Sequence, residues 1–160
     1  MARTLKRRRR EAKTDYKSRL NLLKSEKIRL VVRKTNRYII AQFVESDIAK
    51  DKILFGISSK DLLERGWSKE NIGSLKNKTA GYLTGAMIGK LGKEKIKEAI
   101  LDIGMNRNVK KSRIYSVLKG VLDAGIKIPH SKESLPELNE IKSNKKTEKY
   151  FDKILKEIEK

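Results

Sequence analysis

The chain has 160 residues, which is enough for one ordinary domain and too few for two. It carries 40 Lys and Arg against 20 Asp and Glu, and a formal net charge of +20 disfavours a compact fold unless a polyanion neutralises it. Cysteine is absent and His130 is the single histidine, so disulfides are excluded and neither a zinc site nor any other cofactor is expected.

The chain begins with a basic segment that contains Arg3 and Arg7–Arg10. Residues 1–40 hold 15 Lys and Arg against three acids, whereas residues 131–160 hold eight lysines against seven acids, so a polyanion meets the N-terminal quarter first. A basic N-terminus is often a solvated tail or an import signal. Here the basic run continues into residues that are predicted to fold. We therefore predict a basic arm over residues 1–13.

The first predicted helix covers residues 14–24, TDYKSRLNLLK. Tyr16, Leu20 and Leu23 recur at helical spacing, and either Thr14 or Asp15 suits the N-cap. Tyr16 is interpreted equally well as an anchor of this helix or as a ring that stacks on a base.

Three strands with short connections follow this helix. Residues 28–34, IRLVVRK, alternate between an apolar face and a face that includes Arg29 and Arg33. A turn at Thr35 and Asn36 leads into a strand of β-branched and aromatic residues over 37–46, and residues 52–58, KILFGIS, form the third strand. The short connections predict an antiparallel meander.

From residue 60 the period changes to that of helices. A short helix is predicted to end at Gly66, and a longer one covers residues 77–92, where three glycines spaced by four share one face. Something is expected to approach that face closely, and packing of the helix on the sheet is favoured over a membrane helix dimer because lysines flank a short apolar segment.

The rest of the chain predicts a buried strand within residues 99–104 and a helix over 112–124 with an apolar stripe. Residues 126–129, IKIP, are predicted to add a short fifth strand. Residues 131–160 are predicted to form a linker and an amphipathic C-terminal helix that either docks on the domain or contacts a partner.

Together these elements predict an α+β fold. We expect a mixed, mainly antiparallel sheet that is covered on one face by helices and partly open on the other, with a basic extended N-terminal arm and a C-terminal helix. The folded domain is predicted over residues 14–130.

The open face is expected to be basic. Arg29, Arg33, Lys34 and Arg37 cluster on and around the first hairpin, and together with the N-terminal arginines they are expected to form a continuous surface for nucleic acid, with Tyr16 or Tyr38 available for stacking. The planar guanidinium suits bidentate phosphate binding.

Catalysis is not expected. Residues 85–91, GAMIGKL, have three residues between the glycines and a leucine after the lysine, so they fail the phosphate-loop pattern of nucleotide-binding enzymes. No acid has a histidine or cysteine nearby in the sequence for acid–base chemistry. No apolar run approaches the roughly 18 residues of a membrane span, and no signal peptide is recognised, so we expect a cytoplasmic protein with no membrane partner and no small-molecule substrate.

An ordered series of blocks resembles the archaeal members of the universal large-subunit ribosomal protein family that is numbered eighteen in bacteria and five in eukaryotes. The blocks are RRRREAKTDYKSRLNLLKSEKIRLVVRKTNRYIIAQFV, DIAKDKILFGISSKDLLERGW, AGYLTGAMIGK, EAILDIGMN and KGVLDAGIKIPHS. They cover most of residues 7–131, whereas residues from 132 onward match less well.

The resemblance implies a ribosomal protein that binds 5S rRNA and links it to the large ribosomal RNA in the central protuberance, beside neighbouring ribosomal proteins. Carried over residue by residue, the RNA-contacting segment of the family falls on Arg7–Arg10, Lys13, Tyr16 and Arg19, and its strand end falls on Arg33, Lys34 and Asn36. Two alternatives remain at this stage: a general DNA- or RNA-binding protein outside the ribosome, and a nucleotide-dependent enzyme, which the broken phosphate-loop pattern disfavours.

Overall fold

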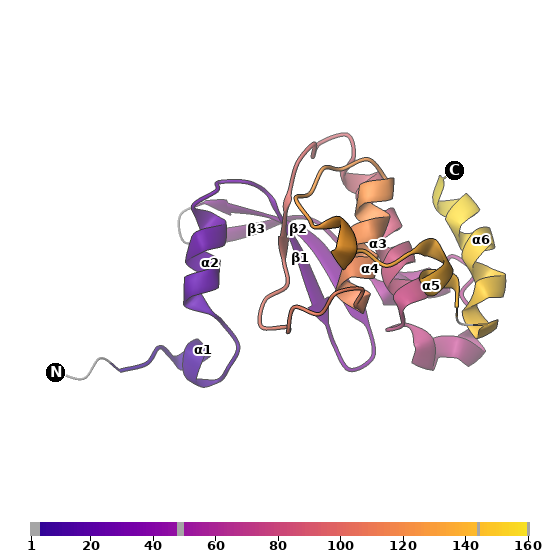
Figure 1. The fold of residues 1–160 in the computed structure, drawn as a ribbon, viewed down its shortest axis with the longest axis horizontal. Helices are drawn as coiled ribbons and strands as arrows, with labels where there is room; N and C mark the ends of the chain where they lie inside the picture. Colours follow the sequence, from indigo (N-terminus) through magenta and orange to yellow (C-terminus); the bar gives the residue numbers. More distant parts are fainter. Residues whose placement is uncertain (1–3, 48–49, 144, 160) are drawn as a thin grey trace.

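A computed structural model of the chain describes residues 4–47, 50–143 and 145–159. Four strands form one sheet in the order β3-β2-β1-β4 (Figure 1). Strand β1 pairs antiparallel with β2 and parallel with β4, and β2 pairs antiparallel with β3. The prediction of an α+β fold with a mixed, mainly antiparallel sheet is confirmed.

The strands lie where the period-two pattern places them. They are β1 (Arg29–Lys34), β2 (Ile39–Asp47), β3 (Lys50–Ser58) and β4 (Ile100–Asp102). Leu30 lies opposite Phe43 in the first antiparallel pair, and both side chains are fully buried in the core. The hairpin between β1 and β2 closes because the Thr35 amide and hydroxyl both donate hydrogen bonds to the Tyr38 carbonyl, at 2.9 and 2.8 Å. This alternation leaves Arg29 and Arg33 on the face opposite the core.

The core face of the sheet is covered by helices. These are α3 (Lys78–Gly92) and α4 (Arg113–Asp123), and the short α5 (Leu138–Lys142) and α6 (Lys145–Glu159) pack on α3. Three 3₁₀ segments connect the elements: η1 (Ser59–Leu63), η2 (Lys69–Ser74) and η3 (Lys132–Ser134). The C-terminal helix α6 packs along α3, where Phe151 and Ile154 are buried and the Phe151 ring lies 5.4 Å from the Tyr82 ring. Of the two possibilities for the C-terminal helix, the structure shows docking on the domain.

The close approach predicted from the glycines of α3 is confirmed, but its partner is α4 rather than the sheet. A Cβ atom at Gly85 would lie 2.1 Å from the Val117 carbonyl oxygen, and one at Gly120 would lie 2.2 Å from the Tyr82 carbonyl oxygen. The backbones of α3 and α4 therefore touch where Gly85 and Gly120 face each other. Only a residue without a side chain fits at either position.

The predicted fifth strand is wrong. Lys127 forms a single parallel bridge with Glu98, and among the described residues 126–129 no strand extends from it. Pro129 follows within two residues of the bridge and cannot donate a ladder hydrogen bond, which limits the pairing to one position.

Two N-terminal helices, α1 (Arg7–Arg10) and α2 (Tyr16–Leu23), lie on the other side of the strands from α3 and α4 (Figure 1). Neither helix contains a buried residue, and Leu20 is 56% exposed. The apolar spacing correctly predicted a helix here, but the helix does not join the core. No helix in the described part of the chain has the length and apolarity that a membrane span requires.

Candidate nucleic-acid interface

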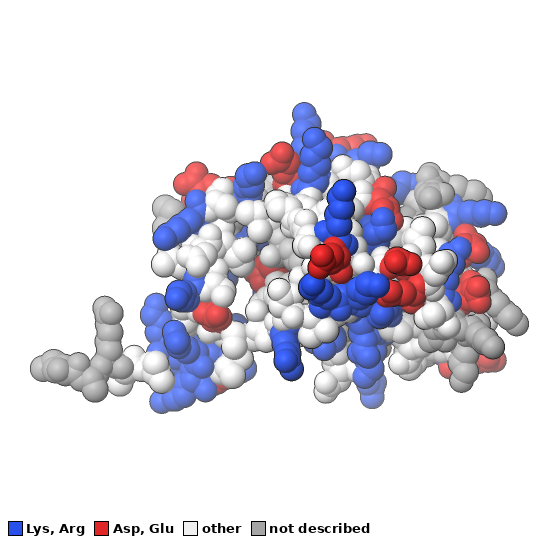
Figure 2. Space-filling model, viewed as in Figure 1, with Lys and Arg blue, Asp and Glu red and all other residues white. Residues whose placement is uncertain are grey.

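The four arginines of α1 are exposed and only partly neutralised. Arg7 lies 3.7 Å from Glu11, which forms a shorter ion pair of 2.9 Å with Lys13. Arg8 uses its Nε to donate a hydrogen bond to the Thr14 hydroxyl at 2.9 Å. Among the described residues, no carboxylate lies within ion-pair distance of the other two, Arg9 and Arg10. Figure 2 shows blue side chains grouped around α1 with few red atoms among them, whereas red and blue alternate over the right half of the molecule.

Helix α2 begins directly behind these arginines and is capped by Asp15. Its carboxylate accepts from the amides of Lys17 and Ser18 at 3.0 and 3.3 Å, which confirms Asp15 rather than Thr14 as the N-cap. The hydrogen bond from the Ser18 hydroxyl, at 2.8 Å, is the main reason why the pKa of Asp15 lies below its usual range. The cap thus fixes where α2 starts, and with it the direction in which the basic arm leaves the domain.

Tyr16 is half-buried, and its ring is covered on one side by Lys6, whose Nζ lies 4.5 Å from the ring centroid. This is a cation–π contact between the arm and α2. The ring is therefore used within the chain, and stacking on a base would need its other face or displacement of Lys6.

A cleft of about 540 Å³ separates α2 from β4 and the loop that follows it. Four cations predicted to bind RNA contribute to its lining, and they come from α1, the loop after it, α2 and β1: Arg8, Lys13, Arg19 and Arg33. Two acids, Asp15 and Asp102, line it as well. The structure thus brings together cations that are up to 25 residues apart in the sequence, in a recess that is positive overall.

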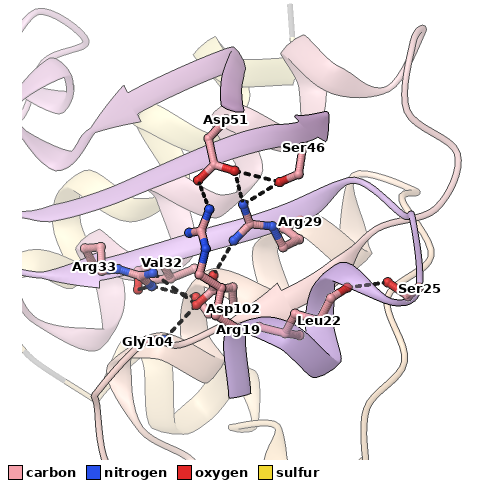
Figure 3. A network of polar contacts seen from close by, with 10 residues as sticks. All are labelled: Arg19, Leu22, Ser25, Arg29, Val32, Arg33, Ser46, Asp51, Asp102 and Gly104. Carbon is pink, nitrogen blue, oxygen red and sulfur yellow. Dashed lines mark hydrogen bonds and ion pairs between the residues drawn. The ribbon is translucent and has the colours of Figure 1, made fainter. Parts of the chain in front are cut away.

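Behind the cleft, three arginines and two aspartates form a continuous network, which Figure 3 shows from close by. Its members, together with one serine, are Arg19, Arg29, Arg33, Ser46, Asp51 and Asp102. The side chain of Arg29 is only 2% exposed and lies at its centre, 2.9 Å from an oxygen of Asp102 and 2.9 Å from an oxygen of Asp51. It also donates to the Ser46 hydroxyl at 2.7 Å. We call this set the arginine–aspartate network.

The expectation that Arg29 lies on an open basic face is therefore wrong. Its guanidinium is buried between two carboxylates, because a buried cation is tolerated only when it is paired. Its Nε is the one guanidinium nitrogen of Arg29 that is buried without a hydrogen-bond partner. The face opposite the core is closed at this end, and Arg29 contributes to the fold rather than to an exposed surface.

Arg19 connects α2 to this network. Its guanidinium lies 2.8 Å from Asp51, as Figure 3 shows, so its charge is shared with the domain. Burial raises the pKa of the Asp51 carboxyl, but hydrogen bonds from Ser46 and Arg19 and the charge of Arg29 outweigh it and hold that pKa below its usual range. Asp51 is thus a carboxylate that fastens α2 to the sheet.

Arg33 is held in place but remains 40% exposed in the cleft. It forms an ion pair of 3.0 Å with Asp102 and donates to the Asp102 carbonyl at 2.9 Å. Gly104 lies against its guanidinium, since a Cβ atom there would come within 2.8 Å of the central carbon, and the φ of Gly104 is +59°. Arg33 is therefore oriented before any ligand binds.

The end of the β1–β2 hairpin carries the remaining predicted residues, Lys34, Asn36 and Arg37, and all three are exposed. Lys76 donates to the Asn36 carbonyl at 2.9 Å, which ties the turn to the segment before α3. In Figure 1 this hairpin and α1 project from the same lower edge of the molecule. These three residues do not line the cleft, and Arg3 lies outside the described residues.

Sequence reasoning missed the acids that organise this region. Asp51 and Asp102 lie 22 and 73 residues from Arg29, and no local pattern marks them as its partners. It also missed Arg107 and Arg113, which lie near Lys34 in space. Within the described ranges, no three His, Cys, Asp or Glu side chains are grouped so that they could hold a metal ion. The arrangement presents cations of the kind that bind carboxylate or phosphate oxygens through charge-assisted hydrogen bonds.

Comparison with known proteins identifies relatives of the chain. A family profile described as ribosomal large subunit proteins 60S L5 and 50S L18 matches residues 2–98 and 91–131. The chain is 50% identical over 137 residues to the large ribosomal subunit protein uL18 of Korarchaeum cryptofilum, covering 85% of this chain and 68% of that protein.

Two further archaeal relatives carry the same name. The protein of Aeropyrum pernix is 46% identical, with 81% of this chain and 60% of the relative covered. That of Methanothermobacter thermautotrophicus is 42% identical, with 85% and 69% covered. The chain thus matches between 60% and 69% of the length of these relatives.

Proposed function

The chain belongs to the family of ribosomal large subunit proteins 60S L5 and 50S L18, and from that membership we propose that it binds 5S rRNA in the central protuberance of the large subunit. The family consists of structural ribosomal proteins, so the chain is a ribosomal constituent rather than an enzyme. In the proposed arrangement the basic arm reaches between 5S rRNA and the large ribosomal RNA in the cytoplasmic ribosome, next to other proteins of the protuberance.

The observation that carries this proposal is the gathering of exposed cations around α1 and the cleft. Arg9 and Arg10 are exposed without an ion-pair partner among the described residues, and Arg8 and Lys13 line the same cleft as Arg33. Apart from Arg33, which lies on β1, these cations belong to α1 and the loop after it, where no residue is buried. We use the name N-terminal surface for the four arginines of α1 together with Lys13, Arg19 and Arg33. Arg29 is left out of the proposed RNA-contacting set because it is buried.

The mechanism follows from how this surface is built. The arm, residues 1–13, has no apolar anchor in its described part, so we propose that it takes its final conformation as it neutralises phosphates and thereby adds affinity. Arg33 is held by Asp102 and by the Gly104 backbone, so it sets where the RNA backbone lies relative to the domain. Lys34, Asn36 and Arg37 extend the contact along the hairpin.

A competition experiment tests the proposal. Full-length protein is bound to a labelled archaeal 5S rRNA transcript and challenged with unlabelled 5S rRNA, with an unrelated folded RNA of equal length, and with duplex DNA of equal charge. Charge alone does not distinguish these competitors. We expect 5S rRNA to compete at least 100-fold better than duplex DNA, because the proposed function requires recognition beyond charge. Equal competition by duplex DNA would favour the alternative of a general nucleic-acid-binding protein outside the ribosome.

A further inference from the structure

A second basic depression lies apart from the cleft, where the β1–β2 hairpin meets the start of α3 and the segment before α4. Its volume is about 290 Å³. Four cations line it, and none of its lining residues is an acid: Lys34, Lys78, Arg107 and Arg113. We call this depression the hairpin pocket.

The charge of the hairpin pocket is largely unneutralised. Within the part of the chain that the structure describes, Lys34, Arg107 and Arg113 form no ion pair. Lys78 lies 3.6 Å from Glu140, and that carboxylate forms a shorter contact with Lys111. In the N-terminal cleft, by contrast, Arg19 and Arg33 are each paired with an aspartate. Like charges gathered in one recess raise the free energy of the unbound protein, and an anion removes that cost.

The recess is formed before any ligand arrives. The hairpin is fixed by the hydrogen bond from Lys76 to the Asn36 carbonyl. The segment before α4 is fixed by the hydrogen bond from the Tyr115 hydroxyl to the Asn108 side chain at 2.7 Å and by that from the Lys111 amide to the Ser134 carbonyl at 2.9 Å. Ile114, which is buried, provides an apolar floor. A ligand therefore meets cations that are carried by fixed backbone segments rather than by a mobile tail.

The chemistry of the lining selects the ligand. Two guanidinium groups present paired donors that match the oxygens of a phosphodiester, and the two ammonium groups add charge without a geometric requirement. We propose that the hairpin pocket binds a backbone phosphate of the RNA that the N-terminal surface binds, so that the RNA is held at two separate points of the domain. This inference rests on the proposed function and names a second site for the same partner, with Arg107 and Arg113 as its specific phosphate ligands.

The test uses the double variant Arg107→Ala with Arg113→Ala in the full chain, and Lys60→Ala with Lys69→Ala as the matched control. Both variants lose two exposed positive charges, but Lys60 and Lys69 lie on η1 and η2, and neither lines the hairpin pocket. Affinity for the 5S rRNA transcript is measured from 50 to 200 mM salt. We expect the pocket variant to bind about 10-fold more weakly at 150 mM and to lower the salt slope by about 0.7 to 0.9, the contribution of one lost phosphate contact. The control is expected to change affinity less than twofold.

A third variant, Arg107→Lys with Arg113→Lys, retains the charge and is expected to recover most of the salt slope but only part of the affinity. If the pocket variant binds 5S rRNA like the wild type, the inference is overturned while the proposed function stands. If the wild type shows no preference for 5S rRNA, the proposed function fails. In that case, weaker binding of the pocket variant to other RNA would still support the phosphate site. A variant that keeps full RNA affinity but no longer assembles into large subunits would assign the pocket to a protein neighbour and overturn the phosphate assignment.

Discussion

The two sides of the sheet are held to their helices in different ways. On one side α3 and α4 meet through facing glycines and cover a core in which Leu30 and Phe43 are fully buried. On the other side α2 contributes no buried residue and is linked to the sheet by an ion pair between Arg19 and Asp51. Apolar packing responds little to salt or pH, whereas an ion pair that is one-third exposed responds to both. The side that carries the N-terminal surface is thus the side whose helix is attached through an ion pair.

The buried part of the arginine–aspartate network joins β1 to β3 and β4 on the side of the sheet opposite the core. Asp102→Ala would leave the buried Arg29 with one of its two carboxylate partners. Removing one partner of a buried ion pair destabilises a protein by about 3 to 5 kcal/mol. We expect a loss of that size in the free energy of unfolding, measured by urea denaturation.

The matched control for this prediction is Asp152→Ala, which removes a carboxylate from an exposed ion pair with Lys142. Its expected effect is below about 1 kcal/mol. Equal effects of the two substitutions would mean that the Arg29 site is hydrated and that the network does not stabilise the fold.

The glycine contact between α3 and α4 gives the next largest effect. In Gly85→Ala the new methyl group would meet backbone atoms of α4, and the overpacking cost of about 1 to 3 kcal/mol exceeds the gain of about 1 kcal/mol in helix propensity. We expect a net loss of up to about 2 kcal/mol by urea denaturation. Gly73→Ala is the control, since no atom lies within 4 Å of its Cβ position, and it should stay within about 0.5 kcal/mol of the wild type. A stabilised Gly85→Ala variant would show that the helices separate easily.

The link between α2 and the sheet gives a smaller and pH-dependent effect. Because Asp51 is 34% and Arg19 36% exposed, solvent screening limits the expected loss in Arg19→Ala to about 1 kcal/mol at neutral pH, and this substitution leaves both carboxylate partners of the buried Arg29 in place. The pKa of Asp51 is depressed in the folded state, so its contribution is present above the usual carboxyl pKa of about 3.9 and is lost as the pH falls through the folded pKa below that value.

Hydrogen exchange in the wild type and in Arg19→Ala locates this effect. Amides of α2 should exchange faster in the variant at neutral pH, while those of α3 stay protected, and lowering the pH through the folded pKa of Asp51 should remove the difference. Uniform loss of protection across both helices would contradict the separation of the two sides.

Local pattern predicted most of the fold. Period-two alternation and β-branched and aromatic residues located β1, β2 and β3, helical spacing located α2, α3 and α4, and residue type narrowed the cap of α2 to Thr14 or Asp15. The short fifth strand over residues 126–129 failed because four residues that end in a proline give too few ladder hydrogen bonds to predict pairing.

The site was predicted less well, for a physical reason. Alternation shows that Arg29 and Arg33 share a face, but what covers that face depends on Asp51 and Asp102, which are distant in sequence. The glycines of α3 likewise indicated a close contact without identifying Gly120 in α4 as its partner. Arg107 joins Lys34 only through the tertiary fold. Pairings over long sequence separations are what single-sequence reasoning lacks.

Deleting residues 1–13 should have the smallest effect on stability and a large effect on RNA binding, because no described residue of this arm is buried. The most direct test of the account is therefore the salt dependence of 5S rRNA binding for the wild type and for this deletion. If about 6 to 10 phosphates are contacted, wild-type affinity should fall by roughly three to five decades between 50 and 200 mM salt, and the deletion should bind more weakly with a flatter slope while unfolding within about 0.5 kcal/mol of the wild type. An unchanged salt slope after deletion would contradict the proposal that the arm binds RNA phosphates.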